Sequence, residues 1–207
     1  MDRRAALKNL TMSMGYVFAT PSLLSVLSSC TTEKVLWKPL FLSAEEQKIV
    51  TELIDIIIPE TDIVGAVAVN IPQFLDLMYK DIEEETKQKV FKNGAKVFAA
   101  SFKEKFGVSV MHGKKQEFEL LLTQYFDLSK PETKEVLQFQ NSPMHKVQRD
   151  QIHRYNLYNF LLSVRYYAIF GYCTSEKVGE EILSYDPIPG EYKGCISVEE
   201  VGNVWSL

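Results

Sequence analysis

The chain has 207 residues, of which 46% are hydrophobic and 12% aromatic, and its formal net charge is −4. Without the first 29 residues, 178 remain, with 20 basic and 26 acidic side chains. That length suffices for one domain with a hydrophobic core. The acidic balance and the lack of any run of basic residues argue against a nucleic-acid-binding protein.

The first 29 residues have the features of an export signal. Arg3 and Arg4 precede an apolar residue and a lysine, in a pattern that resembles the twin-arginine export motif. The uncharged stretch that follows ends in Leu-Ser-Ser-Cys, which resembles a lipobox with Cys30 as the lipidated residue. A transmembrane anchor is the alternative, but serines and threonines make the stretch only moderately hydrophobic. We expect residues 1–29 to be a twin-arginine-type lipoprotein signal peptide and the mature chain to be lipid-anchored at the periplasmic side of a bacterial membrane.

Residues 30–42 are expected to be a tether, and residues 43–207 a single helical domain. Ser43 and Glu46 form a capping box, and Pro59 ends the helix that follows. Gly107 is expected to cap a later helix at its C-terminus. In chain order, the expected helices are Ser43 to Ile58, a helix from near Pro72 to Ile82, Glu84–Phe106, Lys114–Phe126, a short helix from Ser129, Asp150–Phe170 and a short turn over Ser175–Leu183.

Apolar residues recur at helical spacing in each of these segments, whereas the alternating pattern of β-strands is absent. We therefore predict an all-α fold, a compact helical bundle with an extended C-terminal tail beyond Tyr185. The side chains expected to face the core include Ile49, Leu53, Leu75, Tyr79, Ile82, Phe91, Phe98, Phe118, Phe126, Leu161, Tyr166 and Ile169.

No catalytic motif stands out in the sequence. Glycine-rich phosphate loops, nucleophile elbows, paired zinc histidines and haem or iron–sulfur cysteine patterns are all lacking. Asp55, Glu60 and Asp62 could serve a paired-carboxylate hydrolase, but helix caps and surface turns use the same residue types. We therefore expect no catalytic residue, bound cofactor or metal. His112, His145 and His153 are scattered, which favours ordinary surface histidines.

Two cysteines remain beyond Cys30. Cys173 and Cys195 form an even pair in a chain that we expect to be exported, so a disulfide is one interpretation. Free thiols, or thiols that face a partner subunit, are the others, because spacing alone does not fix the geometry.

Aromatic and arginine residues are concentrated in the long helix Asp150–Phe170 and its exit. Ordinary core packing explains most of them, and a partner-binding face is the alternative, since tyrosine and arginine are favoured at interfaces. The residues are Tyr155, Tyr158, Tyr166, Tyr167, Tyr172, Arg149, Arg154 and Arg165.

Two stretches carry a family resemblance. The first is Asp-Ile-Ile-Ile-Pro-Glu-Thr-Asp over residues 55–62, with Gly65 and Ala66 shortly after it. The second starts as Gly-Tyr-Cys-Thr-Ser-Glu over residues 171–176 and continues through Pro187 and spaced glycines to Cys195. Both stretches resemble the gluconate 2-dehydrogenase subunit 3 family, the small subunit of membrane-associated flavin dehydrogenases.

The resemblance implies an accessory role rather than catalysis. In such complexes, FAD is held by a large subunit of the glucose–methanol–choline type, which oxidises a sugar or sugar acid, and a cytochrome c subunit can take the electrons. The small subunit has no redox centre and is expected to help the large subunit mature and pass the twin-arginine translocase. The alternative that the sequence leaves open is a free-standing lipoprotein that acts as a binding module without an enzyme partner.

The loop after Pro59 and the tail from Tyr172 to Cys195 are the elements that we expect to contact the partner. Prolines stiffen the tail, and its tyrosines could anchor it at low entropic cost. The residues expected at this contact are Pro59, Asp62, Tyr172, Tyr185, Pro189 and Tyr192.

Overall fold

The computed structural model describes residues 37–188, 190–191 and 194–206, and within these ranges the regular structure is helical apart from one isolated bridge. The predicted all-α fold is confirmed. The helices are α2 (Ala44–Ile57), α3 (Ile71–Asp81), α4 (Glu85–Phe106), α5 (Lys115–Phe126), α6 (Lys130–Gln140), α7 (Ile152–Cys173), α8 (Glu176–Glu181) and α9 (Val198–Val201), with short 3₁₀ turns at Val110–His112, Met144–Lys146 and Arg149–Gln151.

The helix ends follow the local signals of the sequence. The Ser43 side chain accepts a hydrogen bond from the backbone amide of Glu46 (3.3 Å), and the Glu46 carboxylate accepts one from the amide of Ser43 (2.8 Å). This capping box starts α2 as predicted. Gly107 ends α4 with a φ of 73°, a conformation that favours glycine.

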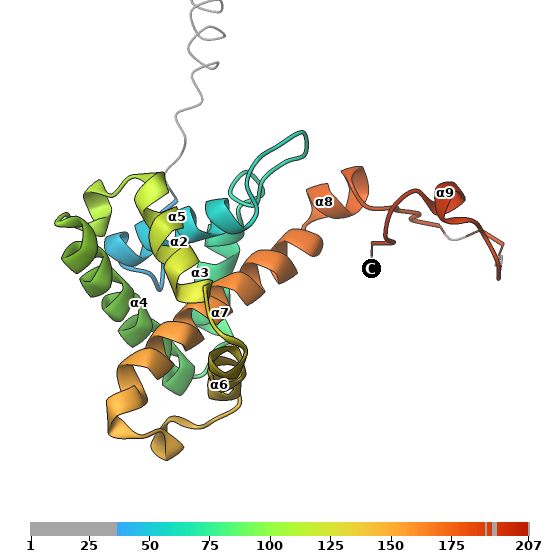
Figure 1. Cartoon of the computed structure of the whole chain (residues 1–207). Coiled ribbons are helices and arrows are strands. Elements are labelled where there is room, and N and C mark those ends of the chain that lie inside the picture. Colours follow the sequence, from blue (N-terminus) through green and yellow to red (C-terminus); the bar gives the residue numbers. More distant parts are fainter. Residues whose placement is uncertain (1–36, 189, 192–193, 207) are drawn as a thin grey trace, which may run out of the picture. The chain divides into compact units, whose positions relative to one another are not determined.

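The centre of the fold is the contact between α4 and α7, the two 22-residue helices, which lie side by side (Figure 1). Phe91 and Phe160 meet edge to face with ring centroids 4.8 Å apart, and Phe98 packs beside Phe160 at 6.2 Å. All three rings are almost fully buried, which contributes about 2 kcal/mol each. Helices α2, α3 and α6 pack against α7, and α5 packs against α2.

The segment that leads into α2 is held by two charged side chains. Asp76 of α3 is 1% exposed, and its carboxylate accepts hydrogen bonds from the backbone amides of residues 40–42 at 2.7, 3.0 and 2.8 Å. From α4, Lys92 donates to the carbonyl of Phe41 (2.5 Å) and pairs with Glu46 (2.6 Å). The last residues of the predicted tether therefore belong to the helical unit.

Four of the predicted core positions are wrong. Ile82 is 67% exposed because it lies just beyond the end of α3, where no neighbouring helix covers it. Phe126, in the last turn of α5, is 40% exposed. Tyr166 and Ile169 are 57% and 43% exposed, because the second half of α7 turns other residues towards its neighbours. Apolar periodicity alone does not reveal which side of such a helix remains open.

The C-terminal segment is less extended than predicted. Ser184 donates from its amide to the carbonyl of Val204 (2.9 Å) and accepts at its own carbonyl from the amide of Ser206 (2.9 Å). These bonds form an isolated bridge between Ser184 and Trp205, and α9 lies within the loop that they close. The segment therefore folds back on itself.

Candidate functional site

Two stretches that lie far apart in the sequence meet at the C-terminal end of α7. The hydroxyl of Tyr172 donates a hydrogen bond of 2.6 Å to the carbonyl of Val64, in the loop that joins α2 to α3. The same loop turns so tightly at Gly65 that a Cβ there would lie 2.6 Å from the backbone nitrogen of Glu60. Only glycine fits such an approach. The segments 55–66 and 171–176 are thus parts of one structural feature.

The contact continues from the loop into α3. A Cβ on Gly171 would lie 2.6 Å from the ring of Phe74, so this ring of α3 packs directly against the backbone of α7. Ala66 is fully buried, and its carbonyl accepts a hydrogen bond from the amide of Ile71 (3.1 Å), the first residue of α3. The loop is therefore fixed at both ends.

The residues expected to contact a partner fall into three groups. Pro59 and Asp62 are exposed on the loop, and Tyr185 is 49% exposed in the C-terminal segment. Tyr172 departs from the expectation, because its ring is only 8% exposed and its hydroxyl is occupied by the loop. Its role is to hold the loop in place. Two further positions, Pro189 and Tyr192, lie outside the described residues.

The tyrosines of α7 divide by burial. Tyr155 and Tyr158 are 6% and 4% exposed, and their hydroxyls donate to backbone carbonyls at 3.0 and 2.9 Å. Tyr167 is buried as well and donates to the carboxylate of Glu83 (2.6 Å). Burial raises the pKa of Tyr167 above the ordinary tyrosine value. Core packing explains these three tyrosines, whereas Tyr166 points outward.

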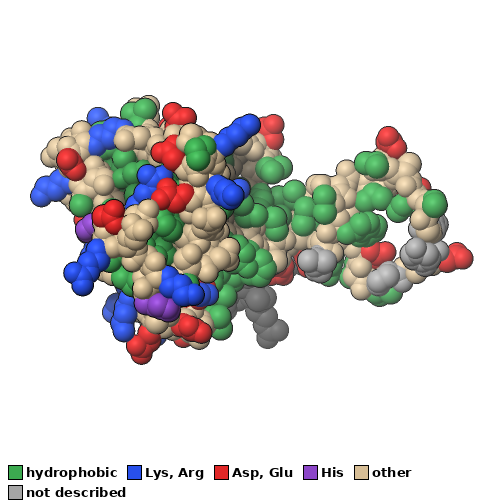
Figure 2. Space-filling model, turned by 60° about the horizontal axis from the view of Figure 1, so that its bottom comes forward, with side chains coloured by type: hydrophobic (Ala, Val, Ile, Leu, Met, Phe, Trp, Pro, Cys, Tyr) green, Lys and Arg blue, Asp and Glu red, His purple; other side chains and the backbone are tan. Residues whose placement is uncertain are grey.

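Tyr166 belongs to an open apolar surface, which we call the α7 aromatic face and define as Tyr166, Ile169 and Phe170. The three side chains are 57%, 43% and 43% exposed. The rings of Tyr166 and Phe170 stack at 5.8 Å, and Phe170 also lies 6.1 Å from the ring of Phe74. Figure 2 shows hydrophobic side chains gathered where the helices meet the C-terminal segment. Clustered aromatic side chains that remain exposed are typical of protein interfaces.

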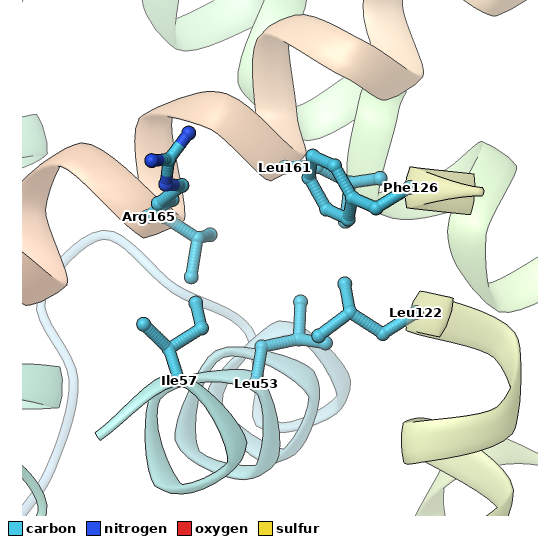
Figure 3. Close-up of a pocket in the computed structure, with 7 residues that line it drawn as sticks. Leu53, Ile57, Leu122, Phe126, Leu161 and Arg165 are labelled. Atoms are coloured by element: carbon cyan, nitrogen blue, oxygen red, sulfur yellow. The ribbon is translucent and has the colours of Figure 1, made fainter. Parts of the chain in front are cut away.

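A groove of about 230 Å³ lies between α2, α5 and α7. In Figure 3, side chains from the three helices point towards one another around it, and Arg165 is its only charged lining residue. The groove contains no acid, general base or nucleophile, so its lining suits an apolar side chain better than a reaction. The lining residues are Leu53, Ile57, Leu122, Phe126, Leu161, Val164 and Arg165.

The acidic residues considered for hydrolysis lie in the last turn of α2 and on the loop that follows it. Asp55 pairs with Lys115 of α5 at 2.5 Å, and this hydrogen bond raises the pKa of the lysine. Glu60 and Asp62 are exposed on the loop. Within the described residues, no group of three or more histidine, cysteine or acidic side chains could hold a metal ion. The three histidines, His112, His145 and His153, are exposed.

The structure shows whether Cys173 and Cys195 are paired. Cys173, the last residue of α7, and Cys195, in the C-terminal segment, are both free and exposed. Of the arrangements that the sequence allows, the structure therefore shows unpaired thiols.

The residues that bear on export lie outside the described part of the chain. Arg3, Arg4 and Cys30, together with residues 1–29 as a signal peptide, remain predictions. Among the helices that the structure describes, none combines the length and hydrophobicity needed to cross a bilayer.

Comparison with models of protein families shows what the chain is similar to. A family model described as gluconate 2-dehydrogenase subunit 3 matches residues 44–190. Neither the curated proteins nor the solved structures contain a match. The matched region covers most of the chain. It includes the loop after α2 and the end of α7, where the two stretches that carry the family resemblance, 55–66 and 171–176, meet. The chain therefore belongs to the gluconate 2-dehydrogenase subunit 3 family, and with it to the subunits of a dehydrogenase complex.

Proposed function

We propose that this chain is the non-catalytic small subunit of a membrane-associated flavin dehydrogenase. It binds a large subunit of the glucose–methanol–choline type that carries FAD and oxidises a sugar or sugar acid. It assists the maturation of that subunit, accompanies it through the twin-arginine translocase by means of the signal at Arg3 and Arg4, and tethers it to the membrane through a lipid at Cys30. A cytochrome c subunit completes the complex where one is present.

The observation that carries the proposal is the α7 aromatic face. An exposed face of this kind loses its contact with water when a partner covers it, and each buried aromatic or isoleucine side chain contributes about 1.5–3 kcal/mol before other costs. Tyr167 and Phe74 support the face from beneath, at 5.2 Å from Tyr166 and 6.1 Å from Phe170. These contacts restrict the two rings, which lowers the entropy lost on binding.

The groove supports an accessory role. Its lining has six apolar residues and one arginine, which offers no group to accept a hydride or a proton from a sugar. The redox chemistry of the complex would then reside in FAD on the large subunit.

The test is co-purification. The chain is expressed with the flavoprotein encoded next to it, and the complex is isolated from the membrane fraction through a tag on the small subunit. The double variant Ile169→Ser/Phe170→Ser should lose most of the flavoprotein. The matched control is Leu120→Ser/Leu137→Ser, because these leucines are also exposed, at 59% and 48%, but lie on α5 and α6.

The co-purification experiment has three possible results, and each one supports or contradicts the proposed function. Recovery of a flavoprotein with the control but not with the α7 variant supports the proposal. Equal recovery with both variants would show that the large subunit binds elsewhere. A chain that emerges from the membrane without any flavoprotein would favour a free-standing binding lipoprotein. Circular dichroism of each variant shows whether its helices are intact.

A further inference from the structure

Helix α4 carries a straight row of lysines on its outer side. Lys89, Lys96 and Lys103 are seven residues apart, so successive lysines lie about 10 Å apart along the axis and are rotated by only about 20°. All three are exposed. We call them the lysine row. Their regular spacing produces a basic surface without any run of basic residues in the sequence.

The lysine row faces away from the core. The buried rings of α4 belong to Phe91, Phe98 and Phe102, which occupy the opposite side of the helix. Between residues 86 and 103 the sequence contains five lysines and no acidic residue, although the whole chain has a net charge of −4. Within α4 itself, acidic residues stand only near the two ends of the row, at Glu85, which pairs with Lys89 at 3.5 Å, and at Glu104.

The domain begins beside this helix. Lys92 of α4 donates to the carbonyl of Phe41 (2.5 Å), and its ammonium group lies 4.1 Å from the centre of the Phe41 ring. The first residues of the helical unit therefore lie against α4, and also against α3, whose Asp76 binds the amides of residues 40–42. Eight residues, 31–38, lie between Cys30 and Pro39, the first residue of this unit, and the nine Cα–Cα steps from Cys30 to Pro39 span at most about 30 Å.

We propose that the lysine row lies against an anionic lipid surface and sets the orientation of the anchored domain. This inference rests on the proposed lipid anchor at Cys30. The short chain would hold α4 near the bilayer, and negative headgroups attract lysines that lie within a Debye length, about 8 Å at physiological salt. Each lysine near such a surface should favour the membrane-apposed orientation roughly fivefold. A lipid chain and a basic surface together fix a protein more firmly than either one alone.

The experiment uses the mature lipidated chain in vesicles. A fluorophore is attached to Ala100→Cys, an exposed position on the outer side of α4, in a chain whose Cys173 and Cys195 are changed to serine. One vesicle preparation contains phosphatidylcholine alone, and the other also contains phosphatidylglycerol. A water-soluble quencher then reports how far the fluorophore is protected.

Protection is expected on the phosphatidylglycerol vesicles, and it should be lost in about 1 M salt, where the Debye length falls to about 3 Å. It should also be lost in the triple variant Lys89→Gln/Lys96→Gln/Lys103→Gln. The control, Lys80→Gln/Lys130→Gln/Lys134→Gln, removes the same charge from exposed positions on α3 and α6 and should retain protection.

Equal protection on both kinds of vesicle, or equal behaviour of the two triple variants, would overturn the inference. Protection that appears only when the flavoprotein is added would assign the row to a protein contact and would also overturn it. The anchor itself is tested separately, by the mass of the lipidated chain. Binding of the flavoprotein is tested by the α7 variants, so a failure here is distinguishable from a failure of the proposed function.

Discussion

Asp76 should be among the most sensitive positions of the fold. Its carboxylate is 1% exposed and accepts three backbone hydrogen bonds from residues 40–42, at 2.7, 3.0 and 2.8 Å. Hydrogen bonds to a charged group contribute about 1.5–3 kcal/mol each, although such bonds are not additive. We expect Asp76→Ala to lower the free energy of unfolding by about 3–5 kcal/mol.

The assay is thermal and urea denaturation of the purified chain. For a domain of this size, the expected loss corresponds to a decrease in Tm of roughly 10 °C. Hydrogen exchange should show that the amides of residues 40–42 lose their protection, because their acceptor has gone. Asp81→Asn is the matched control, since Asp81 ends the same helix and is exposed, and it should change stability by at most about 0.5 kcal/mol.

The opposite result would refute this reasoning. If Asp76→Ala cost less than about 1 kcal/mol and residues 40–42 kept their protection, the carboxylate would not be what holds the segment. Residues 40–42 would then be held against the helices by other contacts, such as the bond from Lys92 to the carbonyl of Phe41.

Three further predictions concern the tyrosines and cysteines. Tyr172→Phe removes one hydrogen bond to the loop and should cost about 1 kcal/mol, with faster proteolysis in the loop after α2; unchanged cleavage would contradict the role assigned to the hydroxyl. Burial raises the pKa of Tyr79 and Tyr167, so their contribution to folding stability should be fully present below about pH 10, where an unfolded tyrosine ionises, and should be lost at higher pH; urea denaturation above and below about pH 10 tests the sign. Cys173 and Cys195 should both react with a thiol reagent in the native chain, whereas a mass lower by two hydrogens and no reaction would indicate a disulfide.

Local signals made part of the fold predictable. Ser43 and Glu46 form the predicted capping box, and Gly107 ends α4, because each of these features depends on residues within one helical turn. Burial depends on tertiary packing instead. Tyr166 and Ile82 have the spacing of core residues but face solvent, since no neighbouring helix covers them.

The site was harder to predict than the helices. The sequence identified the loop after Pro59 and the end of α7, but not that Tyr172 would be buried between them. The role of Asp76 could not be predicted from the sequence, because the backbone amides that it binds are more than 30 residues away. The lysine row was detectable in principle, since a repeat of seven places residues on one side of a helix, but a search for consecutive basic residues misses it.

The central claim is that this chain binds and tethers a flavin-bearing dehydrogenase and does not react by itself. The direct measurement is sugar-dependent dye reduction by the tagged small subunit after isolation from membranes, with and without co-expression of the neighbouring flavoprotein. The account predicts a yellow, active complex in the first case and a colourless, inactive chain in the second. Dye reduction by the chain alone, or a membrane-bound chain that never retains the flavoprotein, would contradict it.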